Sequence, residues 1–290
     1  MPPFDKILIA NRGEIAVRII RACHEMGIRT VAVYSDADRA GMHVRMAHEA
    51  RRIGPPPSTD SYLRIDRIVE AARDTGAQAI HPGYGFLSEN AGFARACRDA
   101  GIVFIGPSPE SMEAIGDKVR ARALMTEAGV PVVPGTPPLS ADPAEVVPLA
   151  EEIGYPVLLK ASAGGGGKGM RIVRNSKELP SLLAQAKGEA GSSFGDDTVF
   201  LEKYVERPRH IEVQVLGDTH GNTVHLFERD CSIQRRNQKV VERAPAPYLD
   251  DKQRAELSGY ALKIASATDD VGAGTVEVLM DADTGAFYFI

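Results

Sequence analysis

The stretch from Tyr155 to Val173, YPVLLKASAGGGGKGMRIV, decides how the middle of this chain folds. Its first apolar run ends at Lys160, five glycines surround Lys168 within residues 164–169, and a second apolar run follows. Two hydrophobic strands around a glycine-rich loop predict a hairpin. Glycine lets backbone N–H groups approach a ligand closely, and the two lysines add positive charge. The loop is therefore predicted to close over phosphates.

Two familiar phosphate-binding loops do not fit this stretch. In a P-loop the first glycine would stand at position 162, where this chain has Ser162, and Ser or Thr would follow Lys168, where this chain has Gly169. The glycine spacing of a Rossmann loop is present, but residues typical of a strand follow it instead of a helix. The pattern favours a strand–loop–strand flap like the glycine-rich loop of kinases. The alternative is a mobile surface linker.

The composition is that of an ordinary globular protein of about two domains. The 290 residues are 43% hydrophobic and 25% charged. A net charge of −5 argues against a general nucleic-acid-binding surface. Neither a membrane-spanning run nor a signal-peptide pattern is present, so we expect a cytoplasmic protein. Three widely spaced cysteines indicate neither a disulfide framework nor a metal site.

The first hundred or so residues predict a doubly wound parallel α/β domain. Strand patterns occur at 6–10, 30–34, 78–81 and 102–105, with helical patterns between them. The first turn, residues 11–14, lacks the spaced glycines of a dinucleotide site. Residues 81–90 follow a strand at the edge where open α/β sheets bind ligands. Simple turn formation by Pro82 and Gly83 is an equal alternative for this segment.

The second half predicts an α+β domain after a Pro- and Gly-rich hinge at 130–143. A helix at 108–128 precedes the hinge. Strands are expected at 198–205, 211–216, 223–228, 274–280 and 286–290, and helices at 176–190 and 250–268. The polar run 228–242 is either a solvated face or part of a site. Cys231 in that run has no histidine partner nearby in sequence, so we interpret it as a packing residue or part of the wall of a site. Glu277, one acid in an apolar strand, is a candidate ligand for a magnesium–nucleotide complex.

These segments together resemble biotin carboxylase, an ATP-grasp enzyme that is a subunit or domain of biotin-dependent acyl-CoA and pyruvate carboxylases. The motifs that carry the resemblance are 11–16, 81–90, 116–118, the glycine loop, 202–204, 208–210 and 228–232. The resemblance implies a preATP-grasp domain over residues 1–115. It also implies an ATP-grasp domain over 116–290, incomplete at its C-terminus, with a lid subdomain over 131–203.

The resemblance implies an ATP-dependent ligase. Bicarbonate would attack the γ-phosphate of ATP to give carboxyphosphate, and the CO₂ released would be captured by biotin on a carrier protein. The cofactors implied are ATP, Mg²⁺ with Mn²⁺ as an alternative, and carrier-bound biotin. The partners are the biotin carboxyl carrier and a carboxyltransferase, as in acetyl-CoA carboxylase of fatty acid biosynthesis, and the family is usually homodimeric. Neither nucleic acid nor membrane is an expected partner.

The resemblance also assigns site residues. Lys239 would contact bicarbonate as the catalytic residue, and Glu277 would ligate the metal. The residues assigned to ATP are Lys118, Lys160, Gly166, Gly167, Glu202, Lys203, Tyr204, Val205, His210 and Asn237.

Two departures from the family pattern stand out. Asn237 replaces the usual histidine and cannot carry its charge. The family strand that ends like residues 287–290 continues into a segment with a second metal carboxylate, a biotin-site arginine and a base for bicarbonate. We therefore expect a truncated chain that binds nucleotide without turnover and lacks most of the dimer contact. The alternatives are another ATP-grasp ligase, such as carbamoyl-phosphate synthetase or an amino-acid ligase, and a non-catalytic nucleotide-binding module.

Overall fold

The structure, a computed structural model, describes residues 3–116, 118–162, 170–236 and 238–290. It divides into two compact units, Met1–Glu113 and Ala114–Ile290. Each unit contains hydrophobic cores of its own.

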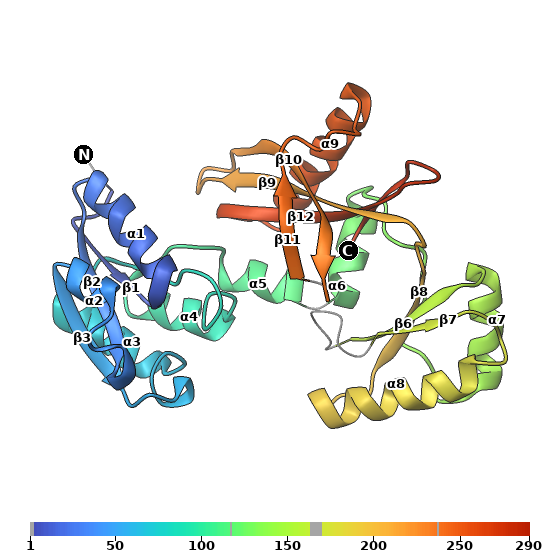
Figure 1. Ribbon diagram of the computed structural model, residues 1–290, viewed down its shortest axis with the longest axis horizontal. Coiled ribbons are helices and arrows are strands. Elements are labelled where there is room, and N and C mark those ends of the chain that lie inside the picture. Colours follow the sequence, from blue (N-terminus) through green and yellow to red (C-terminus); the bar gives the residue numbers. More distant parts are fainter. Residues whose placement is uncertain (1–2, 117, 163–169, 237) are drawn as a thin grey trace. The chain divides into compact units, whose positions relative to one another are not determined.

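The first unit is built on a five-stranded sheet in the order β3-β2-β1-β4-β5, and all of its pairings are parallel (Figure 1). The strands are β1 (Lys6–Ile9), β2 (Arg29–Ser35), β3 (Glu49–Gly54), β4 (Ala79–His81) and β5 (Val103–Phe104). The helices are α1 (Gly13–Glu25), α2 (Met42–Met46), α3 (Ile65–Thr75) and α4 (Ala91–Asp99), with 3-10 turns at Asp36–Asp38 and Ser58–Asp60. The predicted doubly wound parallel sheet is confirmed.

The alternation of β1 explains how this sheet is covered on both faces. Ile7 and Ile9 pack with α1, whereas Leu8 packs in the core that contains α3 and α4. The chain leaves α1 through Gly27, whose φ of +73° suits glycine after a helix. The sequence reading missed the edge strand β3 and the short helix α2.

The second unit contains a five-stranded antiparallel sheet in the order β11-β10-β9-β12-β13. Its strands are β9 (Pro208–Gly217), β10 (Thr223–Arg235), β11 (Gln238–Arg243), β12 (Gly272–Asp281) and β13 (Phe287–Phe289). Apolar residues of α6 (Lys118–Glu127) and α9 (Asp251–Ala267) share a core with one face of β9 and β12. Helix α5 (Pro109–Gly116) precedes residue 117, and the predicted helix 108–128 is found as α5 and α6 on either side of it.

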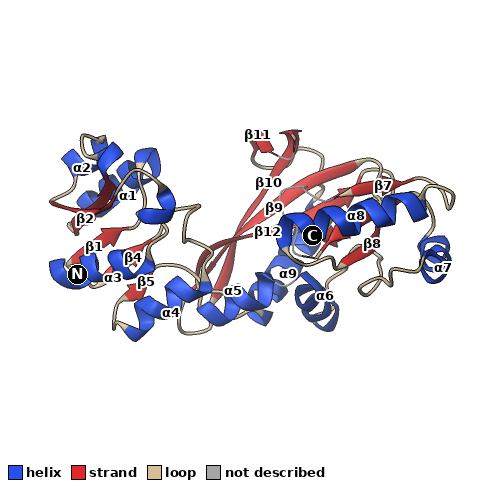
Figure 2. Cartoon of the chain, turned by 90° about the horizontal axis from the view of Figure 1, so that it is seen from below, coloured by secondary structure: helices blue, strands red, loops and turns tan. Residues whose placement is uncertain are grey.

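The opening stretch forms the predicted hairpin. Strand β6 (Val157–Ala161) pairs antiparallel with β7 (Arg171–Val173) and, on its other edge, with β8 (Val199–Lys203). Helices α7 (Pro143–Ile153) and α8 (Leu179–Phe194) share the core of this three-stranded sheet (Figure 2). The loop itself, residues 163–169, lies outside the described residues.

Three predicted boundaries were wrong in this unit. Helix α8 begins at Leu179 rather than after Ser176, because the Asn175 side chain accepts the N–H groups of Lys177 and Glu178 in a local turn. Strand β8 ends at Lys203, so Tyr204 and Val205 lie beyond it. Strand β10 continues to Arg235, beyond the predicted end at 228, so most of the polar run 228–242 belongs to the strands β10 and β11.

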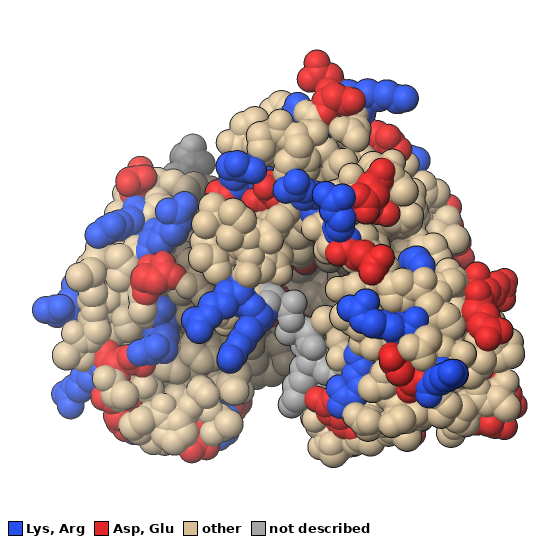
Figure 3. Space-filling model, turned by 45° about the vertical axis from the view of Figure 1, so that its right-hand side comes forward, with Lys and Arg blue, Asp and Glu red and all other residues tan. Residues whose placement is uncertain are grey.

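Acidic side chains lie among the basic ones across the face drawn in Figure 3.

Among the helices in the described ranges, none combines the length and apolar composition needed to cross a bilayer.

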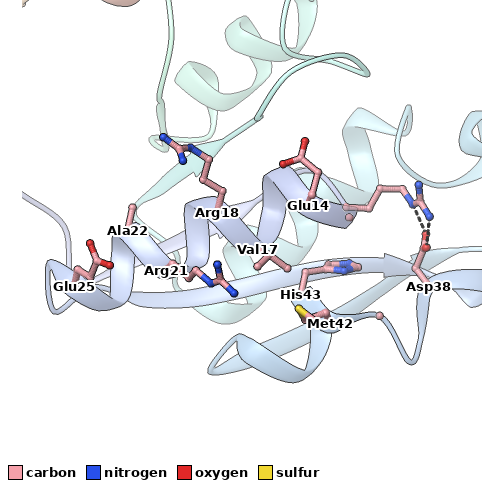
Figure 4. A pocket seen from close by; sticks show the side chains of 12 residues that line it. Glu14, Val17, Arg18, Arg21, Ala22, Glu25, Asp38, Met42 and His43 are labelled. Atoms are coloured by element: carbon pink, nitrogen blue, oxygen red, sulfur yellow. Dashed lines mark hydrogen bonds and ion pairs between the residues drawn. The ribbon is translucent and has the colours of Figure 1, made fainter.

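A hollow of about 840 Å³ runs beside α1 in the first unit (Figure 4). At one end of it Asp38 accepts hydrogen bonds from Arg12, at 2.8 Å from Nε and 2.6 Å from Nη2. The same carboxylate accepts from the Tyr62 hydroxyl at 2.8 Å and the Ser35 hydroxyl at 3.1 Å. Hydrogen bonding from Arg12 is the main reason that the pKa of Asp38 falls to about 2. None of the predicted site residues lines this hollow.

We predict that Asp38→Asn destabilises the protein at pH 7 by about 1–2 kcal/mol, because the folded state holds the ionised carboxylate. A pKa lowered on folding contributes stability above the unfolded value near 3.8, and this contribution is lost as the pH falls toward 2. The difference in urea midpoint between wild type and variant should therefore shrink between pH 5 and pH 2.5. Asp36→Asn, which removes an exposed partner of Arg52, is the control and should show a smaller difference. A difference that does not vary with pH would contradict this account.

Candidate active site

A row of charged residues crosses the five-stranded sheet of the second unit. In the strand register, Arg229 of β10 lies opposite Glu212 of β9, and Glu212 lies opposite Glu277 of β12. The neighbours Ile211 and Val213 point into the core, so the alternation of β9 turns Glu212 to the other face. Like charges directly opposite each other destabilise a sheet, so the two glutamates require a cation between them.

Lys239 of β11 supplies that cation. Its Nζ lies 2.5 Å from Glu212 Oε2 and makes a short contact with Glu277 Oε1. Burial alone would lower the pKa of Lys239, but the hydrogen bonds from its ammonium to the two carboxylates outweigh burial and raise the pKa. At neutral pH, Lys239 is therefore a charged ammonium group whose position is fixed by two carboxylates.

Glu277 keeps one oxygen available for a ligand. Its pKa is lowered to about 2, chiefly by the His210 imidazole and, against the effect of burial, by the Lys239 ammonium. His210 Nε2 lies 3.5 Å from Glu277 Oε2, close enough to favour the ionised carboxylate but too far for a well-formed hydrogen bond, so this buried nitrogen has no hydrogen-bond partner among the described residues. Because Lys239 contacts the other oxygen, Oε2 fits one carboxylate ligand of Mg²⁺ beside phosphate oxygens and water. Ligand atoms of His210, Glu212 and Glu277 lie within 4.8 Å of one another.

A second charged cluster lies on the three-stranded sheet. The Glu202 side chain is 9% exposed, and its oxygens accept from Arg122 Nη1 at 2.6 Å and Lys160 Nζ at 2.7 Å. Arg122 also donates to the Val133 carbonyl oxygen at 2.9 Å. Glu202 thus fixes the end of Lys160, the lysine that precedes the glycine loop.

The segment after Glu202 has some of its backbone groups already engaged. Lys203 N–H donates to Pro134 O and Tyr204 N–H to Pro156 O, at 2.7 and 3.1 Å. The Lys203 ammonium donates to the carbonyl oxygen of Gly154 at 2.7 Å. Within the described ranges, the N–H of Val205 makes no backbone hydrogen bond. A heteroaromatic ligand with a hydrogen-bond acceptor could therefore accept from the N–H of Val205, whereas the N–H groups of Lys203 and Tyr204 are already engaged.

The structure cannot be compared with the prediction at four of the site residues. Helix α6 begins at Lys118, but the lysine side chain is not described. Gly166, Gly167 and Asn237 lie outside the described residues altogether.

The sequence reading missed three members of these clusters, namely Glu212, Arg229 and Arg122. Glu212 occupies a polar position in the alternating strand at 211–216, but the register that pairs it with Glu277 is not visible in the sequence. Cys231 lies in the same cluster, where its thiol donates to Glu212 at 3.2 Å. Burial, followed by the contact with Glu212, raises the pKa of Cys231 to about 12, so the thiol is not an activated nucleophile.

Comparison with known proteins gives two family matches. The pattern of the biotin carboxylase N-terminal domain matches residues 3–112, and that of the carbamoyl-phosphate synthase L chain ATP-binding domain matches residues 117–290. A biotin carboxylase of Halalkalibacterium halodurans is 58% identical over 98% of this chain and 63% of its own length. The propionyl-CoA carboxylase alpha chain of Ruegeria pomeroyi is 54% identical over 99% of this chain and 42% of its own length.

Solved structures agree with these matches. A Campylobacter jejuni biotin carboxylase–βγ-ATP complex superimposes with a TM-score of 0.93 at 50% identity, over 99% of this chain and 64% of that one. The biotin carboxylase domain dimer of Hydrogenobacter thermophilus 2-oxoglutarate carboxylase, with MgADP, ADP and bicarbonate, gives 0.91 at 53% identity, over 100% and 64%. The chain thus spans less than two thirds of the length of these relatives. With an N-terminal biotin carboxylase domain followed by an ATP-grasp domain, it belongs to the biotin carboxylase family.

Proposed function

We propose that this chain takes part in the ATP- and bicarbonate-dependent carboxylation of biotin on a carrier protein, the first half-reaction of a biotin-dependent carboxylase. The observation that carries the proposal is the Lys239 ammonium held between Glu212 and Glu277. A fixed ammonium group, in a row where Arg229 supplies a second positive charge, is suited to hold a small anion such as bicarbonate.

The remaining residues divide into groups by the part of ATP that each would contact. Transfer of a phosphoryl group depends on positioning and charge neutralisation more than on covalent catalysis. Lys118 and Lys160 would hold the phosphates, and Gly166 and Gly167 would supply N–H groups over them. Residues 202–205 would border the adenine and His210 the ribose and phosphates. Asn237 would contribute a hydrogen bond but no charge.

Glu277 would hold the magnesium ion, which neutralises the phosphate oxygens when bound. Its ionised carboxylate and the oxygen that faces away from Lys239 support this assignment. The relative from Hydrogenobacter thermophilus was crystallised with MgADP and bicarbonate.

We predict that Glu277→Gln weakens MgATP binding about tenfold, because the amide removes the anionic ligand while it preserves the shape of the side chain. Isothermal titration with and without EDTA measures this effect. Metal removal should weaken ATP binding to the wild type and change the variant much less. Asp283→Asn, an exposed acid in the turn after the same strand, is the control. Equal metal dependence in both variants would refute the assignment of Glu277.

The proposed reaction requires further protein components. The partners would be a biotin carboxyl carrier and a carboxyltransferase, and acetyl-CoA carboxylase is the candidate complex, in the cytoplasm. The relatives include chains of propionyl-CoA and methylcrotonoyl-CoA carboxylases, which supports a multicomponent carboxylase. The dimer named for the Hydrogenobacter domain supports homodimerisation.

The deciding experiment measures ADP release with bicarbonate and biotin. It is carried out on the 290-residue chain and on an extended chain carried to the length of its relatives. Release that requires both substrates in the extended chain is the expected result. Release driven by ammonia or an amino acid, with biotin inert, would select another ATP-grasp ligase. Tight MgATP binding without turnover in the extended chain would select a nucleotide-binding module.

A further inference from the structure

Glu212 is the most enclosed member of the charged row, and its geometry depends on more than Lys239. Its side chain is 3% exposed. While Oε2 contacts Lys239, Oε1 lies 2.6 Å from Arg229 Nε and accepts the Cys231 thiol at 3.2 Å. Each carboxylate oxygen therefore has its own cation.

Arg229 is itself held in place from a second direction. Its Nη1 donates to Gln214 Oε1 at 3.1 Å, and Gln214 Nε2 donates to the carbonyl oxygen of Gly274 at 2.7 Å. Gln214 is the next residue after Glu212 on the same face of β9, and Gly274 belongs to β12. The guanidinium is thus tied to three adjacent strands, with the half-exposed Glu242 at 3.5 Å as an outer partner.

The charges of the row balance only when Arg229 is counted. Among the four groups that contact one another through Glu212 and Lys239, Arg229 and Lys239 provide two positive charges and Glu212 and Glu277 two negative ones, while the half-exposed Glu242 lies at the solvent edge. Without Arg229 the row would carry a net negative charge beside the proposed bicarbonate site and would repel the anion. Glu212 would also lose the contact that fixes its orientation, since a planar guanidinium orients a carboxylate better than an ammonium group does.

We infer that Arg229 is a positioning residue: through Oε1 of Glu212 it orients the carboxylate that holds Lys239, and it balances the charge of the site for a small anionic substrate. The inference rests on the proposed function for the identity of that anion. Its structural part, the coupling from Arg229 through Glu212 to Lys239, is independent of the reaction.

The kinetic test compares Arg229→Met and Arg229→Lys in the extended chain. Arg229→Met should raise the KM for bicarbonate at least about tenfold and lower kcat about tenfold, with the KM for ATP changed less than about twofold. Arg229→Lys restores the charge but not the planar fork, so the KM should recover more than kcat. A fall in kcat with unchanged bicarbonate KM in both variants would overturn the charge-balancing role.

The structural test uses the 290-residue chain at one pH. NMR relaxation of the Lys239 Cε group, assigned from a Lys239→Arg spectrum, reports the order of this side chain. Arg229→Met should lower that order markedly. Arg207→Met, which removes an exposed arginine before β9, should leave it unchanged. Val276→Ala destabilises the same sheet from its core face and controls for lost stability.

The two tests distinguish failure of the positioning role of Arg229 from failure of the proposed function. If Lys239 stays as ordered in Arg229→Met as in Val276→Ala, the positioning role is wrong. If Lys239 loses order but the extended wild type shows no biotin-dependent ADP release, the proposed function fails and the coupling stands.

Discussion

Replacing Lys239 with methionine is expected to lower bicarbonate-dependent ADP release in the extended chain at least about a hundredfold. The Kd for MgATP should change less than about threefold. Lys239 is the one described cation shared by Glu212 and Glu277, so its loss removes the charge proposed to hold bicarbonate. It also leaves two carboxylates facing each other across the strand pair, which should raise the pKa of Glu277 from about 2.

The control for this prediction is Lys252→Met, because Lys252 is an exposed lysine in the first turn of α9. It should leave both ADP release and MgATP affinity unchanged. Circular dichroism of Lys239→Met confirms whether the fold is kept. Equal losses of turnover and of MgATP affinity would contradict the role given to Lys239, because they would indicate a general disruption of the site.

Glu202→Gln is expected to destabilise the protein by about 3 kcal/mol. The glutamine keeps the size of the side chain but removes the charge that neutralises Arg122 and Lys160. Both cations are largely enclosed, with side chains 21% and 17% exposed, so solvent compensates them poorly. Urea unfolding monitored by circular dichroism measures the free-energy change.

Glu206→Gln is the matched control for Glu202→Gln. Glu206 lies 4.0 Å from Arg174, and both side chains are more than 60% exposed, so its loss should change stability by less than about 0.5 kcal/mol. A double variant with Lys160→Met should cost less than the sum of its single changes, because the two groups interact directly. If the free-energy changes of the two single variants add up to that of the double variant, the proposed ion-pair cluster is wrong.

The periodic parts of the fold could be predicted from sequence. The parallel sheet of the first unit follows from apolar strands between amphipathic helices, and the β6–β7 hairpin from two apolar runs around a glycine loop. The missed elements have weak local signals. Edge strand β3 contains two adjacent arginines, and α2 has only five residues. Helix α8 begins late because the Asn175 side chain competes for backbone N–H groups, a contact that propensity does not reveal.

The amino-acid sequence alone was enough to predict the fold class, the family resemblance and the candidate residues Lys160, Lys239 and Glu277. These follow from local patterns and motifs. The contacts of Glu212 with both Lys239 and Arg229 became visible only in the three-dimensional structure. The same is true of the contacts of Glu202 with Lys160 and Arg122. Lys239 and Glu212 are 27 residues apart in sequence, and Arg122 and Glu202 are 80 apart. Strand register brings such distant charges into contact, and burial makes each one depend on its partner.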